Sequence, residues 1–202
     1  VVFDELEQND KVVEYITKEI EIKPDYSLGY RNRALRYAVD LKDYEKAEAD
    51  HTKAIELDPE NDKNYYYRGN FYRYLEDNDK AIADYTRAIE LDPADPYNYY
   101  ERGYAFGENE QYNEALASYL KAEELDKDKS LAKSEPLYNN IADNFMNLEQ
   151  NEKAVEYYTK QIAINPDYFL GYRNRAYRYA ADLKDYEKAE ADYTKAIELD
   201  PE

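Results

Sequence analysis

The sequence predicts an all-α protein in which antiparallel helix pairs follow one another along the chain. Three observations support this prediction: a repeated segment, apolar residues at helical spacing, and a Pro after most repeats. The segment KAIELDP at 53–59 returns as RAIELDP at 87–93, 34 residues later, and as KAIELDP at 195–201. Because a repeated helix pair buries its apolar faces against its neighbours, such a chain folds as an array.

The second helix of each pair is marked by Ala, Tyr and Ala at positions i, i+4 and i+7. Ala81, Tyr85 and Ala88 form this triplet in one unit. Residues at this spacing lie on one face of an α-helix. Pro93 then ends the unit, because proline has no backbone N–H to continue the helical hydrogen bonds.

The first helix of each pair carries a stripe at i, i+3, i+4 and i+7, which in one unit is Tyr65, Arg68, Gly69 and Tyr72. We expect the small residue of this stripe to lie where two helices cross closely, since it removes side-chain bulk there. Polar turns such as residues 76–79 join the two helices. Each unit is therefore predicted to be a helical hairpin.

These motifs resemble the tetratricopeptide repeat family over essentially the whole chain. The residues that carry the resemblance in one unit are Tyr65, Gly69, Tyr72, Ala81, Tyr85, Ala88 and Pro93. The resemblance implies one array, a right-handed α-solenoid of antiparallel helix pairs, with about five full units and a partial unit at the N-terminus. The expected units are 1–26 (partial), 27–61, 62–95, 96–134 (with an insertion), 135–168 and 169–202.

Composition and charge argue against several classes of function. The chain has 27 basic and 46 acidic residues, a net charge of −19, which disfavours binding to nucleic acid or to anionic membranes. It has no Cys and one His, so thiolate metal sites and thiol nucleophiles are excluded. We expect no enzymatic activity, no cofactor and no metal. The compartment stays open, with the cytoplasm as the default.

Charged and polar residues at core positions have a structural interpretation. Arg33, Arg68 and Arg175 are each followed by an Asp at the facing position of the second helix, so we expect Arg–Asp pairs within the hairpins: Arg33 with Asp50, Arg68 with Asp84 and Arg175 with Asp192. Arg102 is the fourth such Arg and has no Asp there. His51 occupies a position where related units have Tyr, and is predicted to be a core aromatic residue.

The resemblance also implies that a second stripe of each first helix lines the concave side of the array. The predicted groove residues are Arg31, Lys63, Tyr66, Asn70, Arg73, Tyr74, Tyr97, Tyr100, Tyr104, Asn139, Arg173 and Tyr177. The same stripe contains Leu35 and Asp143. The tyrosines of its middle part would form a ladder of rings that gives a peptide contact area at low entropic cost. The alternative is that these rings pack on the neighbouring repeat.

The favoured function is a non-enzymatic protein–protein interaction scaffold that binds a peptide or partner segment in this Tyr-lined groove. One subtype of the family grips a C-terminal carboxylate with Lys, Asn and Arg, and this chain lacks that set. We therefore expect a neutral or basic partner rather than an acidic one. The alternative is a structural or designed array that stacks head to tail as a homo-oligomer, motivated by apolar faces expected at both ends and by residues 8–60, which match 150–202 with 10 differences in 53.

Overall fold

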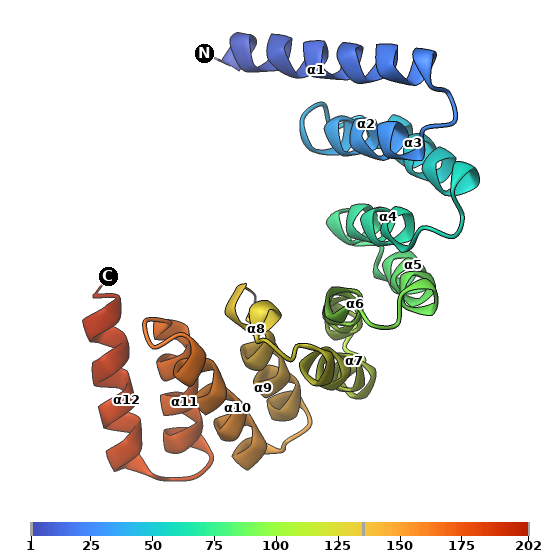
Figure 1. Cartoon of the computed structure of the whole chain (residues 1–202). Coiled ribbons are helices and arrows are strands. Elements are labelled where there is room, and N and C mark those ends of the chain that lie inside the picture. The colour runs from blue at the N-terminus through green and yellow to red at the C-terminus, as the bar shows by residue number, and fades with distance from the viewer. Residues whose placement is uncertain (1, 135, 202) are drawn as a thin grey trace. The chain divides into compact units, whose positions relative to one another are not determined.

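The computed structural model describes residues 2–134 and 136–201, and over these ranges it contains helices and no strands (Figure 1). The all-α prediction is confirmed. Adjacent helices lie in pairs. The helices of these ranges are α1 (Val2–Ile22), α2 (Ser27–Val39), α3 (Tyr44–Leu57), α4 (Asp62–Tyr74), α5 (Asn78–Leu91), α6 (Pro96–Glu108), α7 (Tyr112–Leu125), α8 (Ser130–Ser134), α9 (Leu137–Asn147), α10 (Asn151–Ile164), α11 (Phe169–Ala181) and α12 (Tyr186–Leu199).

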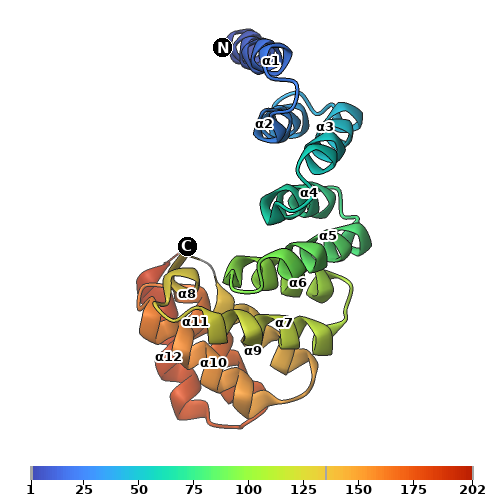
Figure 2. The ribbon, with the colours of Figure 1, turned by 45° about the vertical axis from the view of Figure 1, so that its right-hand side comes forward.

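The chain divides into two compact units, unit 1 (Val1–Ala94) and unit 2 (Asp95–Glu202). Unit 1 holds α1 to α5, and unit 2 holds α6 to α12. Within unit 1, α2 pairs with α3 and α4 with α5, and within unit 2, α6 pairs with α7, α9 with α10 and α11 with α12 (Figure 2). None of the described helices combines the length and the apolar character that crossing a membrane requires.

The turn inside each hairpin follows from its local chemistry. Glu76, between α4 and α5, has a φ of 60°, in the left-handed region that reverses the chain after a helix. Asp77 then caps α5, because its side chain accepts a hydrogen bond from the backbone N–H of Lys80 at 3.3 Å. The predicted polar turn therefore contains both the residue that ends the first helix and the residue that caps the start of the second.

The predicted insertion in the 96–134 unit contains the short helix α8. Asp126, which is buried, accepts hydrogen bonds from the backbone N–H groups of Leu131 (3.0 Å) and Ala132 (2.9 Å). Both of these apolar residues are fully buried. The insertion thus adds to the core of unit 2.

Small and aromatic residues form the core of each hairpin, as the spacing predicts. Ala81, Tyr85 and Ala88 are fully buried. A Cβ atom added at Gly69 would lie 2.8 Å from the Tyr85 ring, and one at Gly103 would lie 2.9 Å from the Tyr119 ring. Glycine at these positions allows α4 and α6 to approach the aromatic ring of the paired helix, which confirms the predicted close crossing.

The predicted Arg–Asp pairs are confirmed in both units. In α4 and α5, Arg68 donates from Nε to Asp84 Oδ2 at 2.7 Å and from Nη2 to Oδ1 at 2.8 Å. The Arg33–Asp50 and Arg175–Asp192 pairs have the same two-pronged geometry. These charge-assisted bonds raise the pKa of each Arg. The fourth Arg, Arg102, donates to Ser118 Oγ at 3.2 Å, and burial lowers the pKa of Arg102.

Candidate functional site

The predicted groove residues divide equally between the two units. Those in unit 1 are Arg31, Lys63, Tyr66, Asn70, Arg73 and Tyr74. Those in unit 2 are Tyr97, Tyr100, Tyr104, Asn139, Arg173 and Tyr177.

An open apolar cavity of 280 Å³ in unit 1 is lined by α2, α3 and α4. Its exposed apolar side chains are Leu35 (41% exposed), Val39 (55%), Tyr67 (37%) and Tyr74 (54%). Asn70 and Arg73 also line it, so three predicted groove residues, these two and Tyr74, come together here. Large exposed apolar side chains around one cavity form a surface suited to an apolar side chain of another molecule.

The cavity wall also contains two buried aromatic residues. His51 is 3% exposed and lies with its ring centroid 5.4 Å from that of Phe71. Burial, together with the nearby Arg68 and Arg31, lowers the pKa of His51 to about 3, so the ring is neutral at physiological pH. The prediction that His51 is a core aromatic residue is confirmed.

Other predicted residues of unit 1 pack against one another. The Tyr66 ring meets the Tyr67 ring edge to face at 5.4 Å, and Lys63 lies 5.7 Å from the centroid of Tyr66. The Arg31 guanidinium lies 4.8 Å from the centroid of Tyr67. These cation–π and edge-to-face contacts hold the aromatic side chains in place beside the cavity.

In unit 2 the predicted residues differ widely in exposure. Tyr177 is 53% exposed and Arg173 is exposed, whereas Tyr100 and Asn139 are buried. The Tyr100 ring packs 5.7 Å from that of Tyr119, and its hydroxyl accepts a hydrogen bond from Asn140 Nδ2 at 3.2 Å. Tyr100 therefore packs within unit 2, on α7 and α9.

Two cavities of unit 2 share Asp143 as a lining residue. The smaller, of 160 Å³, is lined by residues of α6, α7 and α9. The larger, of 340 Å³, is lined by residues of α9, α10 and α11 and includes the predicted Tyr177. Besides Asp143, the smaller cavity is lined by Tyr104, Gly107, Glu108, Tyr112, Tyr119, Asn140, Asn144 and Asn147. Tyr104 is the predicted groove residue among them.

Asp143 is half-buried and held by two neighbours. Asn139 donates from Nδ2 to Asp143 Oδ2 at 2.9 Å, and the Tyr158 hydroxyl donates to Oδ1. Burial raises the pKa of the Asp143 carboxyl, because leaving water disfavours its charged form, and burial likewise raises that of the Tyr158 phenol. Asn139, a predicted groove residue, thus positions a carboxylate at the two cavities.

Sequence reasoning missed several cavity residues, among them Tyr67, Asn140, Asn144 and Arg178. They lie one residue after members of the predicted stripe or within one turn of them. A helix face broader than a single stripe would have included them, since neighbouring positions on a helix are 100° apart.

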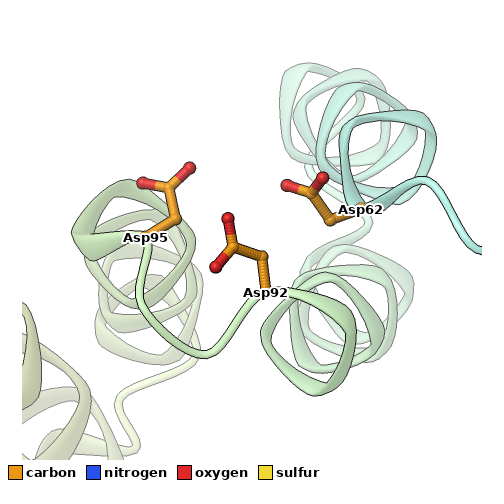
Figure 3. A group of neighbouring side chains, drawn as sticks. All are labelled: Asp62, Asp92 and Asp95. Carbon is orange, nitrogen blue, oxygen red and sulfur yellow. The ribbon is translucent and has the colours of Figure 1, made fainter.

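Three acidic side chains lie at the starts or ends of helices. Figure 3 shows Asp62 and Asp92, which belong to unit 1, and Asp95, which opens unit 2. Each has a local role: Lys63 Nζ lies 3.2 Å from Asp62, Asp92 accepts from the Ala94 N–H at 3.1 Å, and Asp95 caps α6 by accepting from the Tyr97 N–H at 2.9 Å. Caps and turns account for these carboxylates, and we assign no metal to them.

Comparison with solved structures supports the fold. YrrB, described as a TPR protein with an unusual peptide-binding site, superposes with a TM-score of 0.75 at 24% identity, covering 94% of each chain. MamA from Desulfovibrio magneticus RS-1 superposes with a TM-score of 0.74 at 19% identity, covering 87% of this chain and 95% of the other. At these identities the likeness concerns the fold alone.

Sequence comparison finds a local relative and a family. A UDP-N-acetylglucosamine–peptide N-acetylglucosaminyltransferase of Giardia intestinalis is 41% identical over 68 residues, which span 34% of this chain and 4% of the transferase. Family sequence models described as tetratricopeptide repeat match 29–61, 52–83, 96–129, 135–168 and 174–202, and one described as TPR repeat matches 69–110. The chain belongs to the tetratricopeptide repeat family.

Proposed function

We propose that this chain is a protein-interaction module that binds an extended segment of a partner protein along the first helices of its hairpins. The observation that carries the proposal is the 280 Å³ cavity of unit 1, with Leu35, Val39 and Tyr74 exposed around it. Isolated exposed apolar residues are common on protein surfaces, but several around one concave site favour a binding surface. The cavity is large enough for one apolar side chain of the partner.

The partner segment is neutral or basic and carries an aliphatic or aromatic anchor. The net charge of −19 attracts basic segments and repels acidic ones over long range. The apolar lining selects the anchor. YrrB, which shares the fold, is described as having a peptide-binding site, and this supports the assignment of a peptide ligand.

Selection from a random peptide library displayed on phage tests the proposal. We expect enrichment of peptides with a large apolar residue flanked by neutral or basic residues. Tyr74→Ala should weaken the binding of a selected peptide about tenfold in a fluorescence anisotropy titration, because it removes an exposed wall of the cavity.

Val12→Ala is the control, since Val12 is 41% exposed on α1 and lies outside the cavity. This variant should bind like the unmodified chain. Equal affinity of Tyr74→Ala and the unmodified chain, or failure to select any peptide, would contradict the proposal.

A second candidate function is self-association through exposed apolar side chains of α1 and α12. Tyr15 (71% exposed) and Ile22 (79%) lie on α1, and Tyr186 (66%) and Ile197 (64%) on α12. Contact between two copies would bury such side chains. Light scattering over a range of protein concentrations distinguishes the two functions. A mass that stays at the monomer value contradicts self-association. A mass that grows with concentration, and grows less in Tyr186→Ala or Tyr15→Ala, supports self-association.

A further inference from the structure

One residue that lines the smaller cavity of unit 2 has a buried acceptor atom that accepts no hydrogen bond within the described part of the chain. Asn144 is 6% exposed and lines this cavity. Its Nδ2 donates to the backbone carbonyl of Asn140 at 2.8 Å, but among the described residues its Oδ1 has no hydrogen-bond donor. A buried acceptor without a donor is destabilising, so a donor supplied by a ligand would satisfy Asn144.

A carboxylate lies on the wall of the same cavity. Asp143 accepts one hydrogen bond on each oxygen, from Asn139 and from Tyr158. Each carboxylate oxygen has two lone-pair sites, so capacity for a further donor remains on both. Glu108, which is exposed, adds a second acidic group to the lining.

Aromatic rings complete the lining. Tyr104, Tyr112 and Tyr119 line the cavity, and no Lys or Arg is among its lining residues in the described part of the chain. Aromatic faces attract cations, and they do so more strongly where water is excluded. The lining thus combines carboxylate, amide acceptor and aromatic rings, the groups that bind an ammonium or a guanidinium.

Arg178 acts electrostatically on Asp143 and also makes contacts of its own. Arg178 lines the larger cavity, where its Nη1 lies 3.0 Å from Asp182 Oδ2 and its guanidinium lies 4.3 Å from the centroid of the Tyr177 ring. In the described ranges no Lys or Arg nitrogen lies within 4.0 Å of the Asp143 carboxylate. Arg178 therefore influences Asp143 through space, and the carboxylate keeps hydrogen-bonding capacity for a ligand.

We infer that the cavity lined by Asp143 and Asn144 takes the cationic side chain of a lysine or arginine in the bound partner segment. The carboxylate of Asp143 attracts the positive charge and accepts one N–H of the ligand. Asn144 Oδ1 accepts a second N–H of the same side chain. This inference rests on the proposed function, in that it names a side chain of the same partner. It places a cation subsite in unit 2 and the apolar anchor site in unit 1.

Small probes test the subsite without any selected peptide. N-acetyl-arginine amide and N-acetyl-lysine amide are titrated into the ¹⁵N-labelled chain, with N-acetyl-norleucine amide as the uncharged control. We expect the side-chain amide signals of Asn140 and Asn144 to shift with the two cationic probes and to stay in place with norleucine. Equal shifts with norleucine, or shifts confined to other regions, would overturn the inference.

Charge-matched variants sharpen this test. Asp143→Asn should weaken the binding of the arginine probe about tenfold, because it removes the half-buried charge while keeping the shape of the side chain. Glu152→Gln, which removes one exposed charge at the start of α10, should change it less than twofold. Equal binding by Asp143→Asn and the unmodified chain would overturn the inference.

Two further readouts keep the inference testable if Asp143→Asn disturbs the fold. Glu108→Gln on the exposed rim should weaken the arginine probe about twofold, whereas no change would count against the site. If the library yields no peptide but the arginine probe shifts Asn144, the proposed function fails and the cation site stands. If peptides are selected but the cationic probes leave Asn144 unshifted, the cation site alone fails.

Discussion

Residues 8–60 and 150–202 differ at 10 of 53 positions, and the first segment lies in unit 1 and the second in unit 2. The hairpins α2–α3 and α11–α12 make the same ion pair and the same glycine contact with the preceding helix. The Arg33–Asp50 and Arg175–Asp192 ion pairs both measure 2.7 Å. A Cβ atom added at Gly29 or at Gly171 would lie 3.1 Å from the corresponding Ile side chain. Near-identical sequence thus produces near-identical hairpins in the two units.

The same segments differ where a side chain meets other helices. Tyr15 of α1 is 71% exposed, whereas Tyr157, the identical residue of the second segment, is 9% exposed. Tyr157 packs against Tyr138 and Phe145 of α9, and its hydroxyl donates to Glu123 of α7 at 2.9 Å. The neighbouring helices, rather than the residue itself, decide the burial.

At the last helix of each segment, the residue of the first segment is the more buried one. Ile55 of α3 is half-buried, while Ile197 of α12 is 64% exposed. In repeat arrays, stability is approximately a sum of terms within each repeat and terms between neighbours. The two segments share the terms within the hairpin and the Gly–Ile contact with the preceding helix, and they differ in other terms between neighbours, so paired substitutions can separate them.

The largest effect is expected from truncating the two matched tyrosines. Tyr157→Ala should lower the free energy of local opening of α10 by about 3 kcal/mol, because it removes a buried ring and a hydroxyl hydrogen bond. Tyr15→Ala should change the value for α1 by less than about 0.5 kcal/mol, since the ring is exposed. Native-state hydrogen exchange of the amides in each helix measures both values. Equal losses at the two sites would show that contacts with neighbouring helices do not determine how much the tyrosine contributes to stability.

The second prediction concerns the ion pair that the two segments share. Asp50→Ala and Asp192→Ala should each lower the opening free energy of their hairpins by about 2 to 3 kcal/mol, because each leaves an Arg largely buried without its carboxylate. The two losses should agree within about 0.5 kcal/mol when measured by hydrogen exchange. Clearly unequal losses would mean that the contribution of the ion pair to stability also depends on the neighbouring helices.

Much of the fold could be predicted from the sequence because its causes are local. The Ala–Tyr–Ala spacing, the close approach at Gly69 and the pairing of Arg68 with Asp84 all arise within one hairpin, and the structure contains each of them. The structure of the insertion was harder to predict from the sequence. It depends on Asp126, whose carboxylate accepts from backbone N–H groups of α8.

The candidate site was less predictable because it depends on contacts between hairpins. A helical stripe places Tyr100 and Tyr104 on one face but does not show that Tyr100 is buried, with contacts both to Tyr119 of its own hairpin and to Asn140 of the next hairpin. Asn144 lies outside the stripe and yet lines a cavity. Such features depend on the angle and distance between packed helices, which residue spacing along one helix does not specify.

The third prediction uses His51, which stands where the second segment has Tyr193. The pKa of His51 is lowered to about 3 in the folded chain, and the unfolded value is about 6.5. Because the unfolded state binds a proton that the folded state does not, stability should fall as pH decreases below 6.5. Between pH 6.5 and pH 5 the loss should be about 1 to 2 kcal/mol.

His51→Tyr gives the control for this titration, since it makes the position equal to that of the second segment. Urea unfolding at several pH values should show that the variant lacks the loss below pH 6.5 that the unmodified chain has, against a shared background from the carboxylates. Parallel pH curves for the two proteins would mean that His51 becomes protonated in the folded state.

The smallest effect on stability is expected at the matched surface positions Leu35 and Tyr177. Both are exposed, so Leu35→Tyr and Tyr177→Leu should each change the free energy of unfolding by less than about 0.5 kcal/mol. The melting temperature should therefore change little. Their effects on binding should differ, because Leu35 lines the apolar cavity of unit 1 and Tyr177 does not. We expect Leu35→Tyr to weaken a selected peptide with an aliphatic anchor about threefold in fluorescence anisotropy, and Tyr177→Leu to leave its affinity unchanged. If both substitutions weaken the peptide equally, the anchor does not bind in the unit 1 cavity, and positions that correspond in the two segments have equivalent roles in binding despite their different neighbours.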